Sequence, residues 1–142
     1  MFKKGIIVVI VLLFSACSGK SKQDMLMSHD WYYDMYISKP PILIDGKEIE
    51  DLQSIDCFDK DCFVRFQKAT FDMYISDKNC LSKGQKAEAN GSYILLDDNT
   101  MQVTNNEAGV SIEWEIVELT EDVFHYKAEI SGKAFNEIRL VK

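Results

Sequence analysis

Apolar and polar side chains alternate, residue by residue, through most of this chain. The run Phe124–Ile130 has an apolar residue at every second position, and Val110–Ile116 repeats the pattern. Shorter runs at 62–67 and 71–76 do the same. Because successive side chains of a strand point to opposite faces, this period is typical of half-buried β-strands. No segment after residue 17 has a convincing helical period over ten residues.

Turn-forming residues separate the alternating runs. Asp45-Gly46 and Gly132-Lys133 suit tight turns, as do polar groups at 59–61, 97–99, 105–106 and 120–122. Lys39-Pro40-Pro41 is expected to break the first strand, and 77–90 is expected to be a polar loop. We therefore predict strands near 30–38, 52–58, 62–67, 70–76, 91–96, 100–104, 109–119, 123–131 and 134–141.

This spacing predicts an all-β fold, an antiparallel barrel or a sandwich. The interpretation preferred here is an up-and-down β-barrel of about eight strands, which closes its own edges. The interior of such a barrel is either filled by side chains or just wide enough for one small ligand.

The first 17 residues have the features of an export signal. Lys3 and Lys4 precede nine apolar residues, 6–14, a run too short to span a bilayer. The run then ends at Ser15-Ala16-Cys17, which resembles the lipobox of bacterial lipoproteins. That resemblance implies removal of 1–16 and lipidation of Cys17, with acyl chains (palmitate among them) anchoring the protein to a membrane.

The same resemblance divides the chain and sets its location. Residues 17–28 are polar and are expected to be a flexible tether, followed by one domain at 29–142. The residue after Cys17 is Ser18 and not aspartate, which favours the outer membrane of the cell envelope. Loss of Lys3 and Lys4 takes the formal net charge from −7 to −9, so nucleic acid is not an expected partner.

Three cysteines remain once Cys17 carries lipid. An oxidising compartment favours one disulfide, and the sequence allows three pairings. Cys57 and Cys62 flank a four-residue loop, whereas Cys57 and Cys80 lie at strand–loop boundaries. Because Cys62 shares its face with Val64 and Phe66, we expect it to be a buried core residue, which favours Cys57–Cys80.

The order of several short motifs resembles the lipocalin-like domain of bacterial lipoproteins, which is common in the Bacteroidota. The motifs are Asp56–Phe66, then Cys80, then Gly91-Ser92-Tyr93, then Trp114–Thr120. The resemblance covers roughly residues 28–142, and its two cysteines match Cys57 and Cys80. It implies a lipocalin-like barrel and, as partner, a small apolar ligand or another envelope protein.

Two details of the resemblance concern the first strand. The family opens this strand with Gly-x-Trp, whereas this chain has His29-Asp30-Trp31. In lipocalins that tryptophan packs beneath a basic residue of the last strand, so Trp31 and Arg139 are a candidate cation–π pair. The alternative is that Arg139 is simply solvated.

No catalytic constellation is recognisable. His29 and His125 are the only histidines, and His125 lies on the polar face of its strand. The three cysteines lack the spacing of a zinc site, and paired carboxylates such as Asp97-Asp98 fall in predicted turns. We therefore expect no catalytic residue, no metal, no cofactor and no enzyme activity.

A cluster of aromatic residues, 31–36, gives the first strand a second candidate role. Alternation places Tyr32 and Tyr36 together on the face opposite Trp31, where they are a possible interface. The sequence thus leaves two functions open: a binding module for a small apolar ligand or an envelope partner, or a protein-interaction factor (an inhibitor, immunity protein or complex subunit) whose packed barrel has no ligand cavity.

Overall fold

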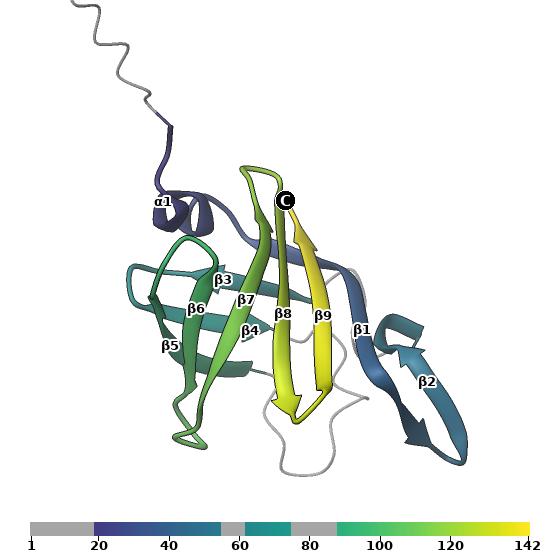
Figure 1. Ribbon diagram of the computed structural model, residues 1–142. Helices are drawn as coiled ribbons and strands as arrows, with labels where there is room; N and C mark the ends of the chain where they lie inside the picture. Colours follow the sequence, from purple (N-terminus) through teal and green to yellow (C-terminus); the bar gives the residue numbers. More distant parts are fainter. Residues whose placement is uncertain (1–18, 55–61, 75–87) are drawn as a thin grey trace, which may run out of the picture.

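The computed structural model describes residues 19–54, 62–74 and 88–142, and in this part of the chain it is a closed antiparallel β-barrel (Figure 1). Eight strands form the barrel in the order β1-β3-β4-β5-β6-β7-β8-β9, and β1 pairs with β9 to close it. The predicted barrel is therefore confirmed. The barrel strands are β1 (Trp31–Ile44), β3 (Phe63–Phe66), β4 (Thr70–Tyr74), β5 (Glu88–Leu95), β6 (Thr100–Asn105), β7 (Ser111–Leu119), β8 (Val123–Ser131) and β9 (Ala134–Val141).

A two-stranded arm projects from the barrel beside β9 (Figure 1). It consists of the second half of β1 and of β2 (Lys47–Asp51), joined at Asp45-Gly46. Both turn residues have positive φ, 50° and 76°, as a tight hairpin requires. A short 3-10 helix, η1 (Leu52–Ser54), follows β2.

The arm corrects two predictions. The prolines at 40 and 41 do not end β1, because the β1–β9 pairing stops at Lys39 and these prolines lie on an edge that needs no N–H donor. The strand predicted at 52–58 is wrong at its start, where the chain forms η1, and 55–58 lie outside the described residues.

Helix α1 (Lys22–Met27) corrects the prediction of a flexible tether at 17–28. Ser21 caps it, since its hydroxyl accepts from the backbone N–H of Asp24 at 3.1 Å. The helix lies across one end of the barrel (Figure 1). Leu26 is 0% exposed there, so this side chain, between Met25 and Met27 in the sequence, holds the segment against the core.

The core fills the barrel from the end that α1 covers. It is formed by the buried residues that alternate along each strand. On β8, Phe124, Tyr126 and Ala128 are buried, as the sequence predicts, while the residues between them face outward. Within the described part of the chain, no helix has the length and apolar character needed to cross a membrane.

Candidate functional site

The interior of the barrel is closed at the α1 end by packed side chains. The indole N–H of Trp31 donates to the carbonyl oxygen of Leu26 at 2.8 Å, and the Trp31 ring lies edge-on to Phe124, with centroids 6.0 Å apart. Both aromatic residues are fully buried. Helix and barrel are thereby locked together by a hydrogen bond that water cannot reach.

A second layer of aromatic rings lies below the first. Trp114 stacks on Tyr126 with ring centroids 4.1 Å apart and planes 12° apart, while Phe66 meets Phe124 and Tyr93 edge-on. Burial raises the pKa of Tyr126 well above its ordinary value, so its hydroxyl stays neutral. In the described part of the chain, large side chains from β3, β5, β7 and β8 therefore pack against one another inside the barrel.

Toward the end of the barrel at the β8–β9 turn, the interior lining becomes smaller and more polar. Trp114, Ala128 and Asn136 are register neighbours on β7, β8 and β9. The indole N–H of Trp114 and Oδ1 of Asn136 are buried and find no hydrogen-bond partner in the part of the chain described. An unmatched donor on β7 and an unmatched acceptor on β9 therefore lie on the two strands that flank Ala128.

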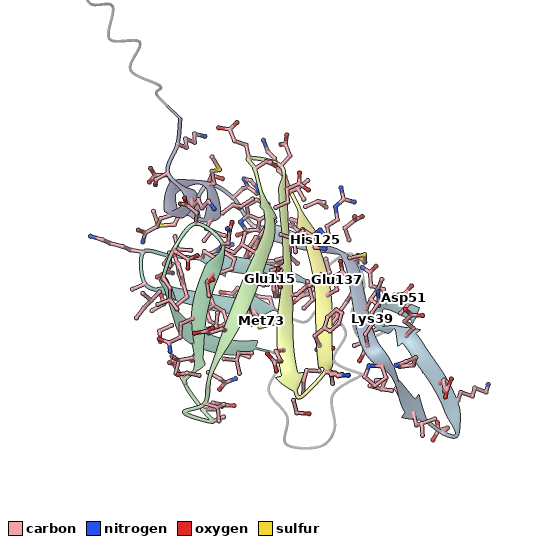
Figure 2. The ribbon with its side chains drawn as sticks, in the orientation of Figure 1. Lys39, Asp51, Met73, Glu115, His125 and Glu137 are labelled. Carbon is pink, nitrogen blue, oxygen red and sulfur yellow. The ribbon has the colours of Figure 1, made fainter. Side chains whose placement is uncertain are left out.

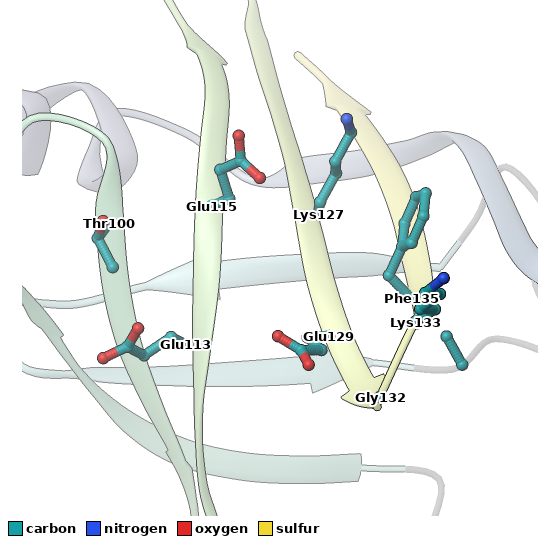
Figure 3. Close-up of a pocket in the computed structure, with 9 residues that line it drawn as sticks. Thr100, Glu113, Glu115, Lys127, Glu129, Gly132, Lys133 and Phe135 are labelled. Carbon is teal, nitrogen blue, oxygen red and sulfur yellow. The ribbon is translucent and has the colours of Figure 1, made fainter.

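A depression of about 480 Å³ lies on the outer face of β6–β9 (Figure 3). Lys127 places its ammonium 5.6 Å from the ring centroid of Phe135, a cation–π contact on the depression's wall. Lys127 also pairs in register with Glu115. The lining residues are Thr100, Glu113, Glu115, Lys127, Glu129, Gly132, Lys133, Ala134 and Phe135.

The sequence does not single out this depression. Alternation correctly places Glu113 and Glu115 on one face of β7, and Lys127 and Glu129 on one face of β8. Which strands lie side by side is a property of the closed sheet, so the convergence of these side chains on Phe135 requires the structure.

His125 takes part in a cluster of polar side chains on the outside of the barrel, among the residues labelled in Figure 2. Its Nε2 lies 2.9 Å from Glu137 Oε1, and Lys39 Nζ lies 3.9 Å from the other oxygen of Glu137. The sequence correctly assigns His125 to the polar face. The cluster ties β1, β8 and β9 together near the seam that closes the barrel.

The predicted cation–π pair of Trp31 and Arg139 does not form. Arg139 faces outward and donates to Asp34 Oδ2 at 2.8 Å, while Trp31 is inside the barrel against Phe124. Arg139 pairs in register with Met35, on the opposite side of the β1 backbone from the core. The basic residue therefore braces the outer surface.

A β-bulge separates the two tyrosines predicted to share an interface. The β1–β9 register shifts between Tyr33 and Met35, which moves Tyr36 to the inner face, opposite Ile138. There its hydroxyl accepts from Asn136 Nδ2 at 3.2 Å. The prediction is wrong for Tyr36, whereas Tyr32 is on the outside with 37% of its surface exposed.

Tyr32 belongs to an aromatic strip across β1, β3 and β4. Its ring meets Phe63 at 5.6 Å, and Phe63 stacks on Tyr74 at 4.5 Å. Arg65 lies over Phe63 and Tyr74 and makes two hydrogen bonds to Asp30, of 2.7 and 2.9 Å. The Arg65 guanidinium lowers the pKa of the Asp30 carboxyl, so this bidentate pair stays ionised.

The cysteine predictions have a mixed outcome. Cys62 is buried in the core, as predicted. Cys17, Cys57 and Cys80 lie outside the described residues, so lipidation and the Cys57–Cys80 bridge stay predictions. Within the described ranges, no group of three His, Cys, Asp or Glu side chains is arranged to hold a metal ion.

Comparison with known proteins adds one solved structure. No protein-family model matches the chain, and no curated protein matches it. An uncharacterized protein from Bacteroides eggerthii is similar in structure, with 17% sequence identity and a TM-score of 0.47. The match covers 80% of this chain and 97% of that protein.

Proposed function

We propose that this protein is a lipid-anchored, non-enzymatic barrel of the cell envelope that binds a partner protein with its outer surface. The observation that carries the proposal is the filled interior. Leu26, Trp31 and Phe124 close one end, and the stacked Trp114 and Tyr126 follow directly below. Among the described residues, this packing fills the axis at the α1 end of the barrel with side chains, which argues against an acyl chain lying along it.

The outer depression around Phe135 is the first surface to test for such a partner. It combines an apolar ring with charged groups of both signs, a composition that suits a polar protein interface. The chain has a formal net charge of −7, and −9 without its leader, which favours a basic partner. The described residues do not support catalysis, because His125 lies on the outer surface and its Nε2 contacts Glu137.

The proposal is tested by recovering the full chain from membranes and identifying what comes with it. Proteins and extracted lipids are both measured by mass spectrometry. We expect a reproducible protein partner that is lost in Phe135→Ser and Glu115→Lys but retained in Asp98→Lys, a charge change in the exposed β5–β6 turn. A defined lipid in stoichiometric amount, with no protein partner, would overturn the proposal.

One observation favours a second candidate, a small ligand with a polar group bound at the β8–β9 end of the interior. The N–H of Trp114 and Oδ1 of Asn136 lie on the strands either side of Ala128, and a polar ligand group that reaches either atom gains a hydrogen bond. An ordered water meets the same need. The candidate predicts that Ala128→Leu, which fills this space, removes any small molecule found by the lipid analysis.

A further inference from the structure

The arm formed by residues 39–51 exposes apolar residues although it has little core of its own. Ile42 is 37% exposed on the face that also carries Ile49, Leu43 is 71% exposed on the opposite face beside Glu48, and in Figure 1 the arm extends away from the barrel. A two-stranded ribbon is marginally stable in water unless it packs against something else. The arm therefore has apolar surface to bury.

The two edges of the arm differ in their capacity to form backbone hydrogen bonds with another strand. The edge of β1 beyond Lys39 carries Pro40 and Pro41, which have no N–H to donate, so it is blocked against pairing. Strand β2 contains no proline and, within the described residues, pairs with β1 alone. Its outer edge is the one that presents backbone donors and acceptors to another strand.

The β1–β2 register gathers the isoleucines of the arm on one face. Ile42 pairs with Ile49, Ile44 with Lys47, and Ile37 with Asp51. Paired residues share a face of the sheet. That face thus has Ile49 at the middle of β2, with a lysine at one end of the strand and an aspartate at the other.

We propose that β2 pairs antiparallel with β2 of a second copy, about a two-fold axis at Ile49. The sequence Lys47-Glu48-Ile49-Glu50-Asp51 is complementary to itself under that axis. Ile49 meets Ile49 of the second copy, and Lys47 meets Asp51 of the second copy twice, once on each side. The result is a four-stranded sheet with an apolar row flanked by opposite charges.

The other face of β2 limits the strength of this pairing. Under the same axis Glu48 faces Glu50 of the second copy, and like charges opposite one another are destabilising. The pairing is therefore expected to be reversible. It is also expected to keep a single register, since a shift by one residue places Ile49 against a glutamate. Neutralising one of them, in Glu50→Gln, is expected to strengthen the association.

The test is a charge swap, measured by analytical ultracentrifugation of the full chain in a mild detergent. Lys47→Asp places two aspartates opposite one another at each end of the interface, and Asp51→Lys places two lysines there. Each variant alone is expected to dissociate at a protein concentration about tenfold higher than the wild type. An equal mixture of the two variants restores the opposite charges at both ends and is expected to form a heterodimer.

Asp98→Lys, the same charge change in a turn remote from the arm, is the matched control and is expected to associate like the wild type. A wild-type chain that is monomeric at every concentration overturns the proposal, and so does a mixture that dissociates like its two components. The proposal goes beyond the proposed function, because neither the lipid anchor nor a partner protein enters this measurement.

Discussion

At the scale of single residues, His29 is a titratable group whose environment opposes its charged form. Its Nδ1 lies 2.8 Å from the hydroxyl of Ser28, while Nε2 is buried with no hydrogen-bond partner in the described chain. Its ring also lies 4.3 Å from that of Trp31, centroid to centroid. Burial lowers the pKa of His29 below its ordinary value of 6.5, and Lys142 adds to the effect.

This lowered pKa predicts a loss of stability in mild acid. The unfolded chain binds a proton at His29 near pH 6.5, whereas the folded chain resists it until the pH is lower. The contribution is therefore complete above pH 6.5 and is lost as the pH falls below that value. Urea unfolding at about pH 7.5 and 5.5 should show a larger decrease in the free energy of unfolding for the wild type than for His29→Gln. Equal decreases would contradict the assignment.

Gly91 is a position at which the fold cannot accommodate a side chain. A Cβ at this position would meet the backbone oxygen of Thr104 and, at 2.5 Å, the ring of Phe71. Since one obstacle is backbone, Gly91→Ala should destabilise the barrel by about 1–3 kcal/mol. Gly19→Ala, where nothing lies within 4 Å, is the control for thermal unfolding. An unchanged melting temperature in Gly91→Ala would contradict the close approach.

At the scale of elements, α1 acts as the plug of the barrel. Leu26→Ala removes a fully buried side chain and is expected to cost about 2–5 kcal/mol of unfolding free energy. Met27→Ala, in the same turn but 38% exposed, should change stability by less than about 0.5 kcal/mol. Denaturant unfolding followed by tryptophan fluorescence measures both. If residues 17–28 were a mobile tether, the two variants would have the same free energy of unfolding.

How far the elements could be predicted depends on what specifies each of them. Alternation specifies a strand locally, so β7, β8 and β9 agree with prediction to within two residues. The α1 helix depends on Leu26 reaching a distant core, and the bulge at Tyr33–Met35 depends on the pairing with β9. The cap residue Ser21 is a local signal for α1, whereas the bulge has none, which is why the predicted position of Tyr36 was wrong.

At the scale of the whole molecule, the barrel end with α1 is also the end at which the chain enters. Lys20 forms an ion pair with Glu121 in the β7–β8 turn, 3.1 Å apart. With the proposed lipid on Cys17, this end of the barrel is expected to lie nearest the membrane, and the arm is expected to lie farther from it (Figure 1).

The proposed lipidation of Cys17 can be tested directly by substitution. Cys17→Ser removes the only sulfur nucleophile at the proposed processing site, so the variant should leave the membrane fraction while its barrel folds as before. Fractionation with immunoblotting, together with the circular dichroism of the purified chain, distinguishes loss of anchoring from loss of folding. A variant that stays in the membrane fraction argues against lipidation.

We propose that this barrel is filled by its own side chains and binds its partner with its outer surface. The most direct test is native mass spectrometry of the full chain extracted from its membrane in a mild detergent. We predict that every chain, whether alone, paired with a second copy or bound to a partner protein, has the mass expected from Cys17 onward with its covalent acyl groups, and that no further lipid is retained. A second, non-covalent lipid present on every molecule and released on unfolding would contradict the account.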